Sequence, residues 1–351
     1  MIQERMLATQ LIENELGIPK RQRLIQATGD RSGWASHYGG LRELVTHAGL
    51  MNSLPVPFDA TWQHGVVEPW RYQRYPLKLL YGIRHKQERL ILVFTGEQRA
   101  VLEELGYSNV HAIGAPFVYA EPIDKPKRRS DSVLVMPPHS LVGAPFEDQS
   151  QIDNYVAFVA NKYKNSGNFL CASIHAACIE NNQWVSEFKK MGIGVVGGAN
   201  HGDANSLKRM WHLFSLFDVV TTPDIGSHVF YALACGCKVV IEGPEILRSE
   251  SQGLKDLSYR RSLMNGEDVL NDQQLKAAKK KFTSAFGRCY TNESLGKEIL
   301  GFDCKKSPEE ICEILGWSKS RQLQMAPKFY VKLLSKKISS VVRRARKRFG
   351  S

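Results

Sequence analysis

The sequence lacks the features that define several protein classes. No run of roughly 18 apolar residues occurs, so no conventional membrane-spanning helix is expected. The seven cysteines are odd in number and irregularly spaced, and no signal-peptide pattern opens the chain. These absences predict reduced thiols and a cytoplasmic location. Cys235 and Cys237 form a CxC pair without a second Cys/His pair at zinc spacing, so we expect buried apolar residues there rather than a metal site.

Several nucleotide-binding and hydrolytic motifs are also missing. The chain has no GxxxxGKS/T, no HExxH and no GxSxG, which excludes P-loop, zincin and α/β-hydrolase sites. The Gly-rich stretch 29–40 does not fit GxGxxG, and no clear strand precedes it. It predicts either a loop that binds a second substrate or a flexible surface turn.

The composition of the chain is typical of a globular protein with a basic C-terminal tail. The 351 residues are 43% hydrophobic and 23% charged, which suggests two domains with a large core. The net charge is +12, but nine Lys and Arg and no acidic residue follow position 327. The body is therefore nearly neutral, and the C-terminal tail carries most of the excess charge.

Short apolar runs alternate with helical patterns along the body, as expected for βαβ units and mostly parallel sheets. The first series has strands at 90–95 and 110–113. After a Pro-rich basic linker, a second series has strands at 132–136, 168–174, 194–196, 218–221 and 238–241. We predict an α/β fold with two Rossmann-like domains, 1–125 and 130–285, followed by helices at 286–325 that return to the body and a basic amphipathic tail at 326–351.

One segment combines strand, turn and helix in a way that suits an anion. A strand ends near Thr222, Gly226 and Ser227 form a turn, and a helix begins near His228. The N–H groups at such a helix start can hold a phosphate, and ligands bind at this end of parallel strands. A plain helix cap by Ser227 is the alternative interpretation.

This segment and the strand after it resemble the donor half of GT-B glycosyltransferases. Upstream, Gly114–Tyr119 followed by Leu134–Ser140 resembles the interdomain junction of bacterial capsule and O-antigen transferases. The resemblance spans roughly residues 60–245. It implies a nucleotide-sugar substrate, no other cofactor and no metal, in keeping with the absence of a DxD motif. The donor-binding residues that it implies are Ser140, Asn200, Gly226, Ser227, His228 and Tyr231.

Two histidines and a glutamate are the candidate catalytic residues. His64 lies before a glycine on a loop, where a neutral imidazole could remove a proton from an acceptor hydroxyl; packing beneath Trp62 is the alternative. Glu68 is the fallback base. His139 follows a strand and two prolines, so it could bind the donor phosphate or protonate the leaving group, or lie in a simple turn.

Further polar residues follow other strands of the second series. Asn200 or Asp203 could contact ribose or base, although an Asp cap on the helix from Ser206 is the more ordinary interpretation of Asp203. His175 follows the strand at 168–174 and is a weaker candidate for the same cleft.

The basic tail predicts a peripheral membrane contact. On a helix, Tyr330, Leu334, Ile338, Val341 and Ala345 form one apolar stripe. The basic residues expected to contact an anionic membrane are Lys332, Lys336, Arg343, Arg344 and Lys347. A solvated, frayed terminus or a nucleic-acid contact are the alternatives, and nucleic acid is the less favoured partner.

The resemblance as a whole predicts transfer of a sugar to a glycan or lipid-linked acceptor, in capsule or lipopolysaccharide synthesis on the inner face of the cytoplasmic membrane. Two reactions on the same fold remain open: CDP-polyol-type phosphotransfer and 2-epimerisation of a nucleotide sugar. A binding module without catalysis is the third hypothesis. The sugar, the nucleotide and the stereochemistry are not determined by the sequence.

Overall fold

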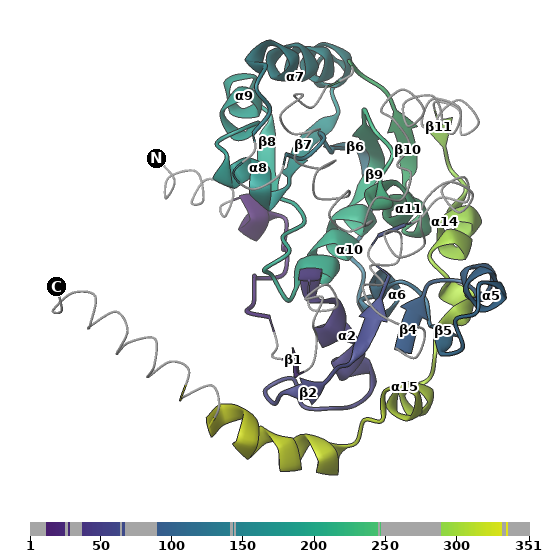
Figure 1. Ribbon diagram of the computed structural model, residues 1–351. Coiled ribbons are helices and arrows are strands. Elements are labelled where there is room, and N and C mark those ends of the chain that lie inside the picture. Colours follow the sequence, from purple (N-terminus) through teal and green to yellow (C-terminus); the bar gives the residue numbers. More distant parts are fainter. Residues whose placement is uncertain are drawn as a thin grey trace, which may run out of the picture.

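The computed structural model shows an α/β protein with a large upper body and a smaller lower one (Figure 1). It describes residues 12–24, 27–28, 37–63, 65–66, 90–140, 143, 145–244, 246, 289–331 and 335. Within these ranges no helix is long and apolar enough to cross a membrane.

The upper body is built on a six-stranded sheet. Its strands are β6 (Arg129–Val135), β7 (Phe169–Ile174), β8 (Gly194–Gly197), β9 (Phe217–Thr222), β10 (Lys238–Ile241) and β11 (Cys289–Tyr290). The order is β11-β10-β9-β6-β7-β8. Neighbouring strands are parallel except for β11, which pairs antiparallel with β10. The chain therefore reverses its direction across the sheet between β6 and β9, as in Rossmann folds.

The lower body holds two smaller sheets. β3 (Ala60–Trp62), β4 (Leu90–Val93) and β5 (Val110–Ala112) form a parallel sheet, and β1 (Ala27–Thr28) pairs with β2 (Val56–Pro57). The predicted α/β class with parallel strands in both halves is confirmed. The short edge strand β11 was not predicted, because two residues carry no readable alternation.

The helices cover the sheets and begin where their sequences provide caps. Thr95 and Gln98 form a capping box at the start of α5, and Ser307 and Glu310 form another before α15. The elements are η1 (His37–Gly39), α2 (Gly40–His47), α5 (Gly96–Glu104), α6 (Pro116–Tyr119), α7 (Gln149–Tyr163), η2 (Lys164–Ser166), α8 (Ala176–Glu180), α9 (Val185–Lys190), α10 (Ser206–Leu216), α11 (Ser227–Ala234), α14 (Glu293–Ile299), η3 (Phe302–Cys304) and α15 (Pro308–Leu315).

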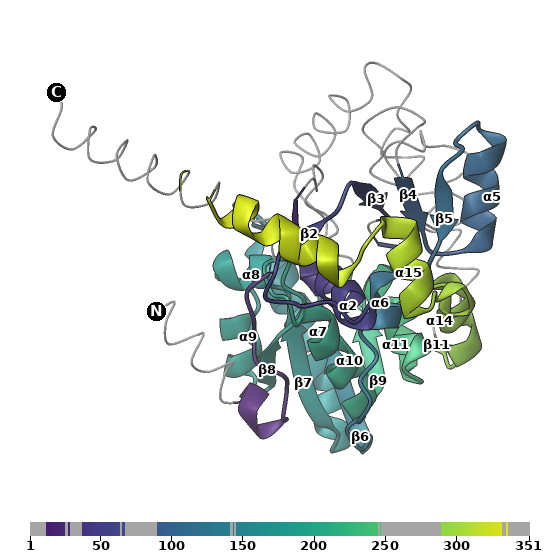
Figure 2. The same cartoon turned by 90° about the horizontal axis from the view of Figure 1, so that it is seen from below.

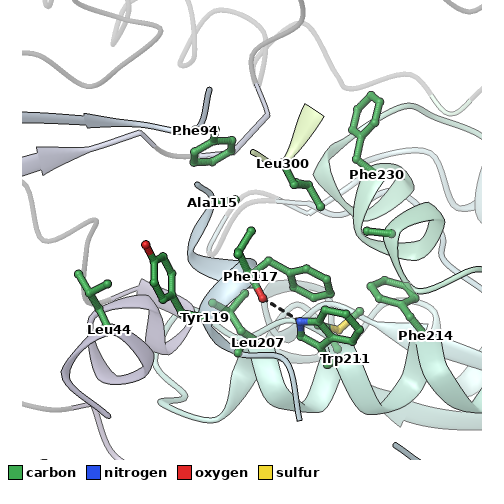
Figure 3. Packing of buried hydrophobic residues seen from close by; sticks show 14 of the residues in the cluster. Leu44, Phe94, Ala115, Phe117, Tyr119, Leu207, Trp211, Phe214, Phe230 and Leu300 are labelled. Atoms are coloured by element: carbon green, nitrogen blue, oxygen red, sulfur yellow. Dashed lines mark hydrogen bonds between the residues drawn. The ribbon is translucent and has the colours of Figure 1, made fainter. Parts of the chain in front are cut away.

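The two bodies share one hydrophobic core around α6 (Figure 3). Phe117 stacks between Trp211, with ring centroids 4.7 Å apart, and Tyr231, at 4.2 Å. The indole Nε1 of Trp211 donates a hydrogen bond to the carbonyl of Phe117 at 2.8 Å. Since Phe117 lies on the connection between the sheets, this packing fixes the junction that faces the cavity described below.

The stretch 12–24 packs against the upper body. The carboxylate of Glu13 accepts a hydrogen bond from Gly197 N at 2.8 Å and pairs with the buried Arg209 at 2.9 Å. The guanidinium of Arg209 also donates to the carbonyl of Pro19 at 2.6 Å. A buried ion pair of this kind needs several hydrogen bonds to offset desolvation, and Arg209 has them. The predicted boundaries assign this stretch to the first domain; its ion pair with Arg209 joins it to the second, and the side chain of Gln22 also accepts a hydrogen bond from Arg42 of the first.

The C-terminal part returns across both bodies (Figure 2). Helix α14 packs on α11 so closely that a Cβ at Gly296 would lie 2.5 Å from Ala234 N. Farther on, Trp317 Nε1 donates to the carbonyl of Pro57 at 2.6 Å. Residues 319–331 are helical, and the side chain of Gln322 bonds the backbone of Met51 in the lower body.

The CxC pair lies inside this packing. Cys237 is buried, and its thiol donates to the carbonyl of Phe214 at 2.8 Å. Cys235 is half-buried. Burial raises the pKa of the Cys237 thiol to about 11 and that of Cys235 well above its usual value. Both thiols are therefore protonated at neutral pH, in keeping with the predicted apolar role.

Candidate functional site

A cavity of about 340 Å³ lies between the two bodies. Its upper wall is formed by residues at the carboxyl ends of β6, β7, β8 and β9, together with the start of α11 and one face of α10. Its lower wall comes from Tyr38, Trp62, Gln63 and Gly65. The reversal of strand order between β6 and β9 lies at this cavity, which is where open α/β sheets bind ligands.

The start of α11 contacts the opposite wall. Ser227 is the first residue of the helix, and its hydroxyl accepts a hydrogen bond from Val66 N at 2.9 Å. Gln63 holds the same loop, because its Nε2 donates to the carbonyl of Gly65 at 3.0 Å. A Cβ at Gly65 would lie 3.1 Å from the Ser227 hydroxyl. The helix start and the loop of the lower body therefore form one continuous surface.

His228 is held in one tautomer beside this helix start. Its Nε2 lies 3.1 Å from the hydroxyl of Thr222. That hydroxyl donates to the carbonyl of Asp224 at 3.1 Å, so the imidazole is the donor and Nδ1 carries the lone pair. Desolvation lowers the pKa of His228 to about 4, with His139 adding to the effect and Asp224 opposing it. His228 is therefore neutral at pH 7.

His175 is the cap of α8 as well as a wall of the cavity. Its Nδ1 accepts from Ala177 N at 3.2 Å, which places the ring proton on Nε2, 3.4 Å from the hydroxyl of Tyr38. Desolvation, and then the neighbouring His139 and His201, lower its pKa to about 3. Both nitrogens of His175 thus have protein partners.

His139 lies between these two rings. It stacks on His175 with centroids 4.5 Å apart, and its Nδ1 lies 3.2 Å from the carbonyl of Ser140. A carbonyl only accepts, so Nδ1 donates and the neutral ring has its lone pair on Nε2. Over the part of the chain that the structure describes, no group of three His, Cys, Asp or Glu residues could hold a metal ion. The imidazoles of His139, His175 and His228 are groups that can take part in hydrogen bonding and proton transfer.

The partly buried histidines of the cavity wall predict a loss of stability in acid. The folded-state pKa of His175 is about 3 and that of His228 about 4, whereas an unfolded histidine titrates near 6.5. Since the unfolded chain then binds more protons, the free energy of unfolding falls as pH drops below about 6.5, by about 2 kcal/mol per histidine at pH 5.

His175→Asn tests this dependence, because asparagine can still cap α8. Urea unfolding at pH 7.5 and pH 5.0 is expected to show a pH-dependent loss about 2 kcal/mol smaller in this variant than in the wild type. His201→Asn, which removes an exposed imidazole, is the control and should lose as much as the wild type. An unchanged loss in His175→Asn would contradict the burial argument.

The structure brings five of the predicted site residues together. His139, Gly226, Ser227, His228 and Tyr231 all line the cavity. Gly226 must remain small there, since a Cβ would lie 3.0 Å from Nδ1 of His228. Two further predicted residues, His64 and Glu68, lie outside the described residues, although the neighbours of His64, Gln63 and Gly65, line the lower wall.

Ser140 and Asn200 are placed differently from the prediction. Ser140 is buried away from the cavity lining, and its hydroxyl accepts from the Asn181 side chain at 2.9 Å. The Asn200 side chain accepts from Gly202 N at 2.9 Å and also lies outside the lining. The Ser140 side chain therefore joins the end of β6 to the residues of and after α8, and the Asn200 side chain holds its own loop. Asp203 is likewise buried and accepts from Gln22 N and Asn205 N, close to the predicted capping role.

Sequence reasoning assigned no individual role to Tyr38, Ser173 or Thr222, although it offered the stretch 29–40, which contains Tyr38, as either a substrate-binding loop or a surface turn. Tyr38 ends the Gly-rich stretch and has a left-handed backbone with φ of 57°, a costly conformation for a bulky residue that often marks a functional site. The two glycines that follow it in the sequence are the feature from which an unusual backbone conformation could have been predicted.

The five basic tail residues lie outside the described part of the chain: Lys332, Lys336, Arg343, Arg344 and Lys347.

No protein-family model and no curated protein matches the chain. Among solved structures, one similar to this chain is the UDP-GlcNAc 2-epimerase from Neisseria meningitidis bound to UDP-GlcNAc. The identity is 10% and the TM-score 0.34, over 90% of this chain and 81% of that chain. A likeness this distant carries no conclusion about the reaction.

Proposed function

We propose that this protein is an enzyme acting on a nucleotide sugar, and that it transfers the glycosyl group to an acceptor hydroxyl in the manner of metal-independent GT-B glycosyltransferases. The observation that carries the proposal is the position of the cavity. It lies where the strand order of the upper sheet reverses, and a loop of the lower body closes it from the opposite side. In such a cavity, a donor bound to one wall would face an acceptor bound to the other wall.

The phosphate of the donor is assigned to the start of α11. The backbone N–H groups of an eight-residue helix and its positive dipole end face the cavity at Gly226 and Ser227. Among the described lining residues there is no Lys or Arg, and Asp224 is the single charged side chain. Leaving-group stabilisation in the described part of the site is therefore assigned to the backbone N–H groups and the dipole at the start of α11.

The chemical step requires one base. The acceptor oxygen forms a bond to the anomeric carbon as the bond from that carbon to the phosphate oxygen breaks, and the acceptor proton moves to an imidazole. His139 suits this role because its neutral tautomer has the lone pair on Nε2. His64, whose chain neighbours Gln63 and Gly65 line the opposite wall, stays a second candidate base.

Nucleotide binding tests the proposal first. In a thermal-shift panel with CMP, CDP, UDP, GDP, ADP and NAD, one pyrimidine or guanine nucleotide should raise Tm, since a ligand at 100 times its Kd stabilises by about 2.7 kcal/mol. The protein is then incubated with the matching nucleotide sugar and acceptor. A new glycosidic linkage supports the proposal. No shift with any nucleotide would overturn it, and a phosphodiester or a 2-epimer as product would replace it with one of the other two reactions.

Membrane association of the tail is a separate part of the proposal. The helix at 319–331 lies along the lower body, with Leu323 and Val331 exposed, and the basic stretch follows it. The full chain is expected to co-sediment with vesicles containing anionic lipid and to leave them at high salt. A quintuple Lys/Arg→Gln variant of Lys332, Lys336, Arg343, Arg344 and Lys347 should remain in the supernatant. Equal binding of wild type and variant would contradict the role of these charges.

A further inference from the structure

We propose that the half of the cavity at the ends of β7 and β8 is a subsite for an uncharged ring bearing hydroxyl groups, with the hydroxyl of Ser173 as the group that recognises it. This inference rests on the proposed function, because it assigns one part of the nucleotide-sugar substrate to one part of the cavity. The phosphate would lie at α11, and the ring on the other side of His139.

Ser173 is the observation that points to a ligand. It is the last but one residue of β7, lines the cavity and is only 3% exposed. Its hydroxyl is buried and has no hydrogen-bond partner among the described residues. An unpaired buried hydroxyl costs about 1–3 kcal/mol, so most such groups in folded proteins are paired. A substrate hydroxyl arriving at this point would satisfy it.

The backbone of Gly198 lies directly beside the Ser173 hydroxyl. Gly198 follows β8, and its N–H donates to the carbonyl of Ile174 at 2.7 Å. A Cβ at Gly198 would lie 2.7 Å from the Ser173 hydroxyl. A side chain at position 198 would therefore overlap the Ser173 hydroxyl, so glycine is the residue that fits beside it in the cavity lining.

The walls of this half carry no ionised group among the described residues. Its polar members include the phenol of Tyr38 and the imidazole of His175, which hydrogen-bond each other, and the hydroxyl of Ser206, which accepts from Asn200 N. Burial raises the pKa of Tyr38 and lowers that of His175, so both rings are neutral at pH 7. An anionic ligand would find no counter-charge from these residues.

An apolar wall completes this half. Leu207 and Met210 lie one turn apart on α10, are almost fully buried and line the cavity. A sugar ring presents hydroxyls at its rim and C–H groups on its faces, which matches a hydroxyl at the floor, two neutral polar rings and an aliphatic wall. The ribose of the nucleotide and the transferred hexose share this chemistry.

The experiment compares two buried serines, of which only Ser173 lines the cavity. Ser215 on α10 is 5% exposed, and its hydroxyl also has no partner in the described part of the chain, but it does not line the cavity. Ser173→Ala and Ser215→Ala therefore delete the same group from two buried positions. Calorimetric Kd values are measured for the nucleotide identified by the thermal-shift panel and for its nucleotide sugar.

Ser173→Ala is expected to raise Kd about three- to tenfold, the usual worth of one hydrogen bond, and Ser215→Ala to change it less than twofold. A rise for the nucleotide sugar alone assigns the subsite to the hexose, and an equal rise for both ligands assigns it to the ribose; either supports the inference. Ser173→Cys, with a weak donor of similar shape, should fall between wild type and alanine. Unchanged Kd values in Ser173→Ala would overturn the subsite and leave the proposed function intact, whereas a wild-type protein that binds neither ligand would refute the proposed function itself.

Discussion

His139→Ala is expected to lower kcat for glycosyl transfer by about 10²- to 10⁴-fold, the usual contribution of a positioned acid or base, while the Kd for nucleotide changes less than threefold. The reason is the set of tautomers in the cavity wall. His175 uses both ring nitrogens for Ala177 and Tyr38. His228 bonds Thr222 through Nε2 and presents Nδ1 beside Gly226, at the phosphate end. His139 lines the cavity and donates through Nδ1 to the carbonyl of Ser140, so the lone pair of its neutral form is on Nε2.

Steady-state kinetics with the nucleotide sugar and acceptor measure this effect, and binding of the bare nucleotide is measured beside it. His201→Ala is the control, because this exposed histidine lies on the loop after β8 without lining the cavity; it should retain wild-type kcat. If His139→Ala kept full activity, the proton would have to be taken by the opposite wall, and His64→Ala would then be expected to show the loss.

Much of the fold could be predicted because its strands are continuous apolar runs. The run 132–136 corresponds to β6 and 218–221 to β9, and buried parallel strands of this kind are readable without an alternating pattern. Strand order is a different matter. The order of the strands depends on which face of the sheet each helix covers, and the periodicity of apolar residues along the chain does not reveal this. The docking of 12–24 on the upper body also escaped prediction, since it depends on Glu13 meeting Arg209, nearly 200 positions away.

Part of the candidate site could be predicted from the sequence, for a similar reason. Residues that directly follow a strand, such as His139 and Gly226, could be assigned because the carboxyl ends of parallel strands share one edge. Ser140 follows the same strand, yet its side chain bonds Asn181, the residue directly after α8, instead of lining the cavity. Adjacent residues at a strand end point in different directions, and sequence position alone does not say which one faces the ligand. Ser173 was missed because it lies within a strand and belongs to no motif.

Gly39→Ala is expected to lower the free energy of unfolding by about 2–4 kcal/mol, from the left-handed backbone and the steric overlap together. Gly39 has φ of +84°, and a Cβ there would lie 2.0 Å from the carbonyl oxygen of Ala204 in the upper body. The carbonyl belongs to backbone and cannot rotate away as a side chain would. The loop that carries Tyr38 would have to lift from the β8 side of the cavity, so weaker ligand binding should accompany the loss of stability.

Gly49→Ala is the matched control for this variant. Gly49 also has a left-handed backbone, with φ of +66°, but nothing lies within 4 Å of the position where its Cβ would be. Its substitution should cost only the conformational part, about 1 kcal/mol, and leave nucleotide affinity unchanged. Urea unfolding of both variants therefore separates backbone strain from the contact with Ala204. If the two variants lost the same free energy of unfolding, the loop could move away from Ala204 without a loss of stability. The contact of Gly39 with Ala204 would then not be what holds Tyr38 against His175.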